Sequence, residues 1–179
     1  MSSPLQIRPS LPADLPAITA IYADAVLHGT GTFELDAPDE AEMGRRRDDV
    51  LAKGLPWLVA ERDGVVLGYA YANHFRPRRA YRFCLEDSIY LASSARGQGV
   101  GRALLDALIA RCEAAGARQL LGVIGDSANA ASIALHRACG FADSGVFKAA
   151  GWKHGRWLDV VLMQRALSDG AASAPADTA

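Results

Sequence analysis

The sequence predicts an α/β fold, in which a mixed sheet of six to seven strands is flanked by helices on both faces. Three observations carry this prediction. Segments with strand and helix spacing alternate along the chain, in the order strand, two helices, three strands, helix, strand, helix, two strands. A hairpin signal early in the chain predicts antiparallel pairing. A strand–helix–strand unit in the middle of the chain predicts parallel pairing.

The length of 179 residues suggests a single domain. We assign residues 1–167 to this domain and expect residues 168–179, which are mostly small and polar, to form a disordered tail. The chain is 50% hydrophobic and 22% charged, which excludes a disordered or collagen-like protein. A net charge of −1 argues against a nucleic-acid partner. Most of the 19 basic residues are Arg, however, so a local anion site remains open.

Targeting and metal signals are missing from the sequence. No apolar run approaches the ~20 residues of a membrane span, and the first residues lack the features of a signal peptide. The three cysteines, Cys84, Cys112 and Cys139, are widely spaced, which is typical of reduced thiols in a cytoplasmic protein. The four His are scattered without an H-E-x-x-H motif, so we expect no metal site and no membrane partner.

The first third of the chain predicts one strand and two helices. Residues 5–8 are expected to form a short strand. A helix opens at Pro12, because proline is tolerated in a first turn, and it ends near Gly29 after apolar residues at helical spacing. Residues 30–33 are expected to form a loop. A second helix, with a charged and solvated face, is expected from residue 38 or 39 to about 53.

The middle of the chain predicts three strands. Residues 57–61 and 65–71 flank Arg62-Asp63-Gly64, and Asp-Gly is a strong hairpin signal. After an arginine-rich loop, residues 81–91 are expected to form a longer strand. Because side chains alternate along a strand, Glu86 lies on its more polar face and Asp87 on the other face.

The last part predicts two further helices and three strands. A glycine-rich turn at 93–101 opens an Ala/Leu-rich helix that ends near residue 115. The continuous apolar run 120–124 is typical of a buried strand. The closing elements are a short helix over 129–139 and a pair of strands over 141–147 and 156–164.

The turn between the third strand and its helix carries the clearest functional signal. Glycines leave backbone N–H groups uncovered, and the helix adds unpaired N–H groups and the positive end of its dipole, which together suit a pyrophosphate. A Walker motif is excluded because no Lys lies nearby, and the G-x-G-x-x-G spacing of dinucleotide sites is not met. A turn whose glycines serve only chain reversal stays an alternative.

The motifs in this region resemble those of a known superfamily. Arg96-x-x-Gly99-x-Gly101 is similar to the acetyl-CoA signature of GNAT N-acetyltransferases, and residues 129–136 with 139–141 resemble its second cofactor motif. Residues 85–91 and 149–160 resemble one branch, the phosphinothricin and methionine sulfoximine acetyltransferases. The resemblance covers roughly residues 5–167 and implies the GNAT fold.

The resemblance implies acetyl-CoA as the cosubstrate. The strand segment before the turn would pair with the pantetheine arm, the turn would hold the pyrophosphate, and the second motif would bind the arm from the other side. A backbone N–H near Leu91 would serve as oxyanion donor if the strand diverges there from its neighbour. The implied cofactor residues are Ile89, Tyr90, Leu91, Arg96, Gly97, Gln98, Gly99, Val100, Gly101, Arg102, Asn129 and Ser132.

Two residues are catalytic candidates. An ammonium group has no lone pair, so the acceptor amine must lose a proton, and the resemblance implies Glu86 as the base. Asp87 is its rival, and a surface pair of Glu86 with Arg82 is the structural alternative. His136 stands where many family members have Tyr. It would assist the amine, protonate the thiolate or hold a water, unless it is simply a surface residue of a helix.

The acceptor site is expected to be cationic, because an α-amino acid analogue carries an anionic end. The implied substrate residues are Phe33, Arg76, Pro77, Arg78, Glu86, Asp87 and Ser88, and a solvated basic loop is the alternative reading of the arginines. The resemblance also implies a homodimer, with the Trp152–Trp157 segment as a further wall.

The expected activity is therefore transfer of an acetyl group to the α-amino group of a small amino-acid analogue of the methionine sulfoximine, methionine sulfone or phosphinothricin type. An acceptor such as a protein N-terminus or another amine, and a non-catalytic acyl-CoA-binding module, stay open as alternatives.

Overall fold

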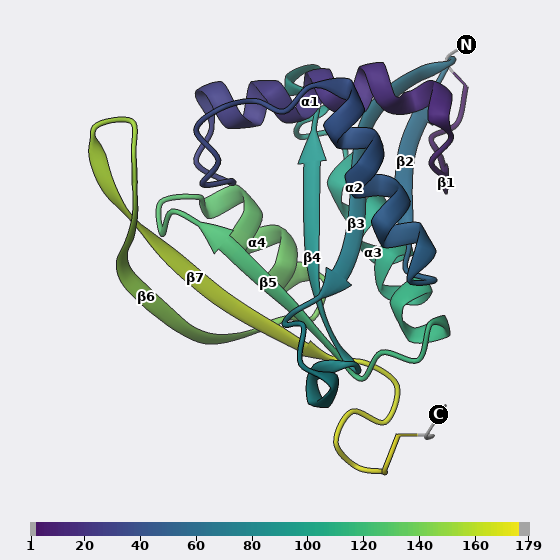
Figure 1. The fold of residues 1–179 in the computed structure, drawn as a ribbon, viewed down its shortest axis with the longest axis vertical. Helices are drawn as coiled ribbons and strands as arrows, with labels where there is room; N and C mark the ends of the chain where they lie inside the picture. Colours follow the sequence, from purple (N-terminus) through teal and green to yellow (C-terminus); the bar gives the residue numbers. More distant parts are fainter. Residues whose placement is uncertain (1–2, 176–179) are drawn as a thin grey trace.

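The computed structural model describes residues 3–175, which form one seven-stranded mixed sheet with α-helices on both faces (Figure 1). This confirms the predicted fold class. The strands are β1 (Gln6–Pro9), β2 (Trp57–Arg62), β3 (Val65–His74), β4 (Cys84–Leu91), β5 (Gln119–Gly125), β6 (Ala142–Lys153) and β7 (Arg156–Ala166). The α-helices are α1 (Leu15–His28), α2 (Glu40–Ala52), α3 (Val100–Ala114) and α4 (Ala130–Ala138).

The strands lie in the order β1-β2-β3-β4-β5-β7-β6. All neighbours are antiparallel except β4 and β5, which are parallel, as the strand–helix–strand unit predicts. The β2–β3 hairpin turns at Asp63 and Gly64, both with positive φ (52° and 75°), which is the backbone that an Asp-Gly turn adopts.

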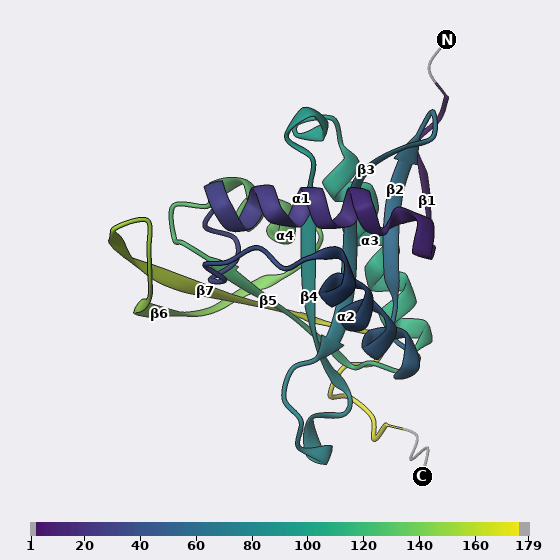
Figure 2. The ribbon, with the colours of Figure 1, turned by 45° about the horizontal axis from the view of Figure 1, so that its top comes forward.

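The two parallel strands diverge before either of them ends. Their pairing stops at Asp87 opposite Gly122, although β4 continues to Leu91 and β5 to Gly125. Figures 1 and 2 show β4 and β5 leaving their common end in different directions. A wedge-shaped opening in the sheet results.

Every second residue of β4 directs its main-chain N–H and C=O groups toward this opening. The Phe83 carbonyl accepts from Gln119 N–H on the β5 side, whereas the Cys84 carbonyl accepts from Phe75 N–H on the β3 side. By this alternation the main-chain groups of Ile89 and Leu91 face β5. No strand within residues 3–175 pairs with them on that side, so these groups are available to a ligand.

The helices cover the two faces in pairs. Tyr22 of α1 packs edge-on against Tyr90 of β4, with ring centroids 4.9 Å apart, while Asp87 of β4 contacts His136 of α4. Residues of odd and even number along a strand lie on opposite faces, so α1 and α4 lie on opposite faces of β4. The largest fully buried side chains lie in both layers: Trp57, Tyr69, Ile18, Met43, Leu85, Leu104, Leu105, Leu108, Leu120, Leu158, Met163 and Leu167.

Most strand boundaries differ from those predicted by one to three residues, and two of the differences have a clear local cause. The third strand begins at Cys84 instead of residue 81, because Arg79–Tyr81 form a 3-10 turn at the end of the arginine-rich loop. Strand β6 runs to Lys153, well beyond residue 147. A bulge at Ala149 (φ 50°), whose N–H donates to the Asp159 carboxylate, shifts the register and lets pairing with β7 resume. The β6–β7 hairpin is therefore longer than expected.

The end of the described chain folds back on the domain. Within residues 168–175 the Ser173 carbonyl accepts a hydrogen bond of 2.8 Å from the Arg118 guanidinium. Residues 1–2 and 176–179 lie outside the described residues, so the single domain over residues 1–167 and the disordered tail stay predictions.

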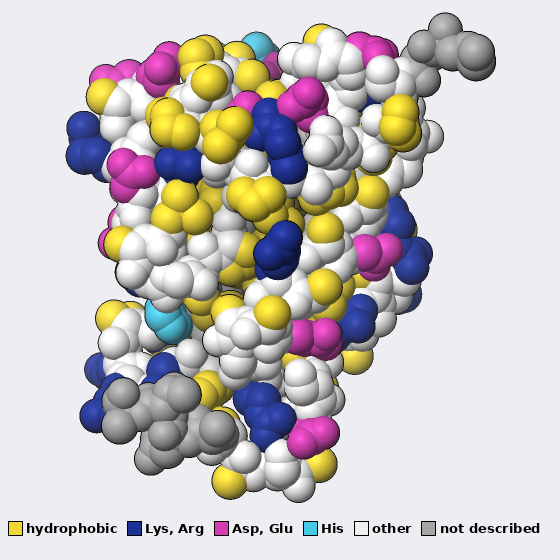
Figure 3. Space-filling view, turned by 90° about the vertical axis from the view of Figure 1, so that its right-hand side faces the viewer, with side chains coloured by type: hydrophobic (Ala, Val, Ile, Leu, Met, Phe, Trp, Pro, Cys, Tyr) yellow, Lys and Arg dark blue, Asp and Glu magenta, His cyan; other side chains and the backbone are white. Residues whose placement is uncertain are grey.

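On the face shown in Figure 3, Lys and Arg side chains lie among Asp and Glu, and neither sign gathers into a patch. None of the described helices is long and apolar enough to cross a membrane. Within the same residues no group of three metal-binding side chains occurs. Cys84, Cys112 and Cys139 are free thiols.

Candidate active site

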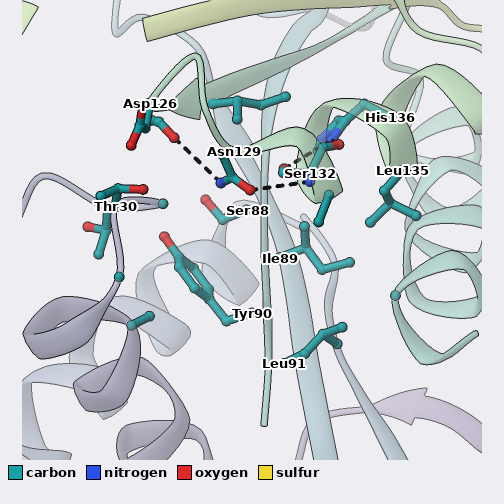
Figure 4. A pocket seen from close by; sticks show the side chains of 18 of the residues that line it. Thr30, Ser88, Ile89, Tyr90, Leu91, Asp126, Asn129, Ser132, Leu135 and His136 are labelled. Carbon is teal, nitrogen blue, oxygen red and sulfur yellow. Dashed lines mark hydrogen bonds between the residues drawn. The ribbon is translucent and has the colours of Figure 1, made fainter. Parts of the chain in front are cut away.

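A cavity of about 820 Å³ occupies the opening between β4 and β5. Figure 4 shows its walls: the outer half of β4 on one side, α4 on another, and the loop after α1 opposite them. Fifteen of the residues predicted for the site line it, namely Phe33, Glu86, Asp87, Ser88, Ile89, Tyr90, Leu91, Arg96, Gly97, Gly99, Gly101, Arg102, Asn129, Ser132 and His136.

The glycine-rich turn has the backbone that its sequence predicts. Gly97 and Gly99 both have positive φ (72° and 79°), which side-chain-bearing residues rarely adopt. Gly99 is also the N-cap of α3, and no side chain among residues 3–175 caps this helix. The first-turn N–H groups of α3 are therefore left for a ligand, and a helix N-terminus favours an anion.

The arginines of the turn lie at the rim of the cavity. The Arg96 guanidinium is mostly exposed and stands 3.8 Å from the Asp24 carboxylate. Arg102 Nε donates to Asp106 Oδ2 at 2.7 Å. Both side chains can turn toward a phosphate group, because an exposed ion pair contributes little stability.

Asn129 and Ser132 join the cavity wall through the start of α4. The Asn129 side chain caps this helix by accepting from Ser132 N–H at 3.3 Å, and its Nδ2 lies 3.5 Å from the Gly125 carbonyl. The Asn129 amide thus ties α4 to the end of β5. Its contact with a cofactor stays a prediction.

Glu86 is the best-placed base. It lies on the α1 side of β4 and lines both the main cavity and a second cavity of about 230 Å³, formed with Tyr71, Asn73, His74 and Ser88. Burial raises the pKa of the Glu86 carboxyl, the neighbouring Asp87 charge raises it further, and the Arg76 charge opposes them. A raised pKa brings a carboxyl toward the range of a general base.

Asp87 points to the other face and pairs with His136. His136 Nε2 lies 3.0 Å from Asp87 Oδ1, and Nδ1 lies 2.7 Å from the Ser132 carbonyl. Both partners offer an acceptor oxygen, an arrangement that favours the doubly protonated, cationic form of the imidazole. Burial lowers the pKa of His136, but the hydrogen bond and charge of Asp87 outweigh burial, and the pKa is raised.

Five predicted residues lie outside the cavity walls. Gln98 donates to the Ser94 carbonyl, and Val100, the first residue of α3, is fully buried. Arg76, Pro77 and Arg78 are exposed on the β3–β4 loop, where the Arg76 guanidinium lies over the Phe75 ring. The loop is extended by the 3-10 turn Arg79–Tyr81, so that β4 begins only at Cys84. The Arg76 charge acts on Glu86, and the direct contact of Arg76 with an acceptor stays a prediction.

Sequence reasoning missed several residues of the walls. Thr30 and Thr32 line the cavity beside Phe33, and Asp126 lines it at the end of β5 with positive φ (70°). Asp126 accepts from Ala128 N–H and from Arg156. A Gly-Asp pair directly after a buried strand was the available signal, because such pairs form turns at strand ends.

These features define a class of protein. An open backbone turn at a helix N-terminus, a wedge lined by free main-chain groups and a partly buried carboxyl are suited to a protein that binds an extended anionic ligand and accepts a proton beside it. The residues fit acetyl-CoA.

Comparison with known proteins gives the family. The model of the acetyltransferase (GNAT) family matches residues 19–141. The phosphinothricin N-acetyltransferase of Alcaligenes faecalis is 61% identical over 162 residues, which are 90% of this chain and 82% of that protein. The L-methionine sulfoximine/L-methionine sulfone acetyltransferase of Pseudomonas aeruginosa is 44% identical over 170 residues, which are 94% of this chain and 98% of that protein.

A solved structure agrees with these relatives. The GNAT superfamily phosphinothricin acetyltransferase of Sinorhizobium meliloti, in complex with acetyl-CoA, superimposes with a TM-score of 0.94 at 50% identity, covering 97% of this chain and 94% of that one. The chain therefore belongs to the GNAT family, in its phosphinothricin and methionine sulfoximine acetyltransferase branch, and is an acetyl-CoA-dependent N-acetyltransferase. The resemblance noted in the sequence is confirmed.

We predict that His136 makes the stability of the fold depend on pH. Its folded-state pKa is raised above 6.5, so its contribution is fully present below pH 6.5 and is lost as pH rises through the folded-state pKa. Urea unfolding of the wild type and His136→Gln from about pH 6 to about pH 9 measures this. The stability difference between them should narrow with rising pH. His28→Gln, on an exposed side chain, is the control. A difference that stays constant would contradict a cationic His136.

Proposed function

We propose that the chain transfers the acetyl group of acetyl-CoA to the α-amino group of amino acids of the phosphinothricin, methionine sulfoximine or methionine sulfone type. The observation that carries this proposal is the position of Glu86. Its side chain lines both the large cavity in the sheet and the smaller cavity on the α1 side. A base in this position would reach an amine in one cavity and an acyl group in the other.

Acetyl-CoA supplies the activated acetyl group when it binds. The glycine-rich turn, with Arg96 and Arg102 at its rim, would hold the pyrophosphate, since its N–H groups and charges converge there. The free main-chain groups of Ile89 and Leu91 would pair with the pantetheine arm as a missing strand would. Asn129 and Ser132 close the opposite wall of the wedge.

The chemistry assigns different tasks to the neighbouring groups. Glu86 accepts a proton from the acceptor ammonium, which frees its lone pair for direct attack. The Leu91 N–H faces the opening and stabilises the negative charge that develops on the acyl oxygen. His136 has no ring nitrogen free to accept a proton, so base catalysis falls to Glu86. Donation of a proton toward the departing thiolate is the role left to His136.

The acceptor is proposed to enter through the smaller cavity. Tyr71 and Asn73 of β3 stand opposite Ser88 and Glu86 in the strand register, so the four side chains share one face. Asn73 Oδ1 accepts from its neighbour's N–H and from Lys53. Its Nδ2 is thus turned elsewhere, as a donor for an acceptor oxygen. The Arg76 charge on the adjoining loop favours an anionic acceptor.

The function is tested by incubating the purified protein with acetyl-CoA and a panel of acceptors while free thiol is measured. Phosphinothricin, methionine sulfoximine and methionine sulfone should each release thiol well above ordinary amino acids and above a peptide with a free N-terminus. Turnover confined to the peptide would favour the protein N-terminus as acceptor. Cofactor binding without any turnover would favour the non-catalytic module.

Glu86→Gln should lower kcat/KM at neutral pH by ~10²-fold or more, because the amide cannot accept a proton. In the wild type, activity should rise with pH through the raised pKa of Glu86, and the variant should lose this limb. Glu40→Gln, on an exposed helix end, is the matched control. A variant with the wild-type pH–rate profile would remove Glu86 from this role.

We also propose that the enzyme is a homodimer that uses the outer face of the β6–β7 hairpin. Phe147, Trp152 and Trp157 are 59%, 57% and 61% exposed, and exposed aromatic groups of this kind mark interaction surfaces. Light scattering should give the mass of two chains, and Trp152→Ser with Trp157→Ser should shift it toward one chain. A wild type that stays monomeric at micromolar concentration would contradict the proposal.

A further inference from the structure

A buried lysine at the tip of the β6–β7 hairpin has no part in the chemistry described above. Lys153 is 3% exposed, and its Nζ donates to the Thr32 carbonyl at 2.8 Å. Burial lowers the pKa of this ammonium, and the nearby Glu34 opposes the shift. Burying an ammonium group is costly unless its contacts compensate, so the Lys153–Thr32 contact needs an explanation.

The same hairpin tip holds the α1–α2 loop at two further points. His154 Nε2 lies 3.0 Å from the Gly29 carbonyl. The Phe33 ring packs where a side chain on Gly151 would stand, so only glycine at 151 admits it. Three nearby residues of the hairpin thus contact Gly29, Thr32 and Phe33 of the α1–α2 loop.

The gripped segment forms part of the cavity wall. Gly29, Thr30, Thr32 and Phe33 line the cavity, and Figure 4 shows Thr30 on the side opposite α4. A second tether of the segment comes from α1, where the Tyr22 hydroxyl lies 3.0 Å from Thr32 Oγ1. A third comes from the end of β5, where Asp126 bonds to the Thr30 side chain. Residues 29–33 therefore take their position from α1, from β5 and from the hairpin tip that carries Lys153.

We propose that Lys153 is a positioning residue for the acceptor: it holds residues 29–33 over the face of β4 that presents Glu86. This inference rests on the proposed function. The glycine-rich turn lies at the far end of the cavity and takes no bond from Lys153 or His154. Loss of Lys153 should therefore weaken the use of the acceptor and leave the binding of acetyl-CoA intact.

The test compares Lys153→Met with Lys148→Met, a control on an exposed lysine of the same strand. Lys153→Met should raise the acceptor KM by about tenfold, as expected when a wall of the site is misplaced, while the acetyl-CoA KM stays unchanged. Hydrogen exchange of the peptide that covers residues 29–34 should be faster in Lys153→Met than in the wild type or in Lys148→Met. Equal changes in both KM values, or unchanged exchange, would overturn the proposal.

Two further variants keep the proposal testable if Lys153→Met fails to fold or if the protein shows no turnover. Lys153→Gln keeps a donor for the Thr32 carbonyl without the charge, and it should restore part of the slow exchange. His154→Ala removes only the contact of His154 with the Gly29 carbonyl, and it should speed exchange of the same peptide. Because exchange requires no turnover, it tests the tether even if every acceptor in the panel fails. Unchanged exchange in both Lys153→Met and His154→Ala would overturn the proposal.

Discussion

The divergence of β4 and β5 is the constraint on which the site depends, and a buried ion pair stands where it begins. The last paired residues are Asp87 and Gly122. His136 bonds to Asp87, and its ring fills the space that a side chain at Gly122 would take, with Nε2 3.1 Å from where that Cβ would lie. The cation therefore occupies the apex of the wedge. Removing one partner of such a pair would leave a buried charge uncompensated.

Two adjacent carboxyl groups are separated by the alternation of one strand. Asp87 faces α4 and is neutralised by a buried imidazolium, whereas Glu86 faces the acceptor side and has no such partner. The charge of Asp87 is itself one cause of the raised pKa of Glu86. Neighbouring carboxyl groups in unlike environments commonly take unlike roles. Here one carboxyl fixes the shape of the site and the other is placed to exchange a proton.

How much the sequence could predict follows from how each part is built. The glycine-rich turn is made of consecutive residues, and its backbone conformation requires glycine at two of them. Gly97 and Gly99 therefore make this turn predictable from the sequence. The alternation of β4 correctly separated Glu86 from Asp87. The boundary of β6 was wrong because a bulge at Ala149, stabilised by Asp159, resumes the pairing that small residues appear to end. The start of the third strand was also wrong, because a 3-10 turn at Arg79–Tyr81 precedes Cys84.

The walls of the proposed acceptor site could not be predicted from the sequence, because they are built from distant segments. Its walls come from the α1–α2 loop, from β3 and β4, and from the far hairpin, which meet only through tertiary contacts. No short motif encodes a bond between Lys153 and Thr32, because the two residues are separated by most of the chain. A site built on backbone atoms can retain one ligand while a site built on side chains varies, since substitutions change side chains and leave N–H groups in place. This division lets one fold keep its cosubstrate and change its acceptor, and it places the determinants of acceptor choice in residues 29–33, in β3 and in the hairpin tip.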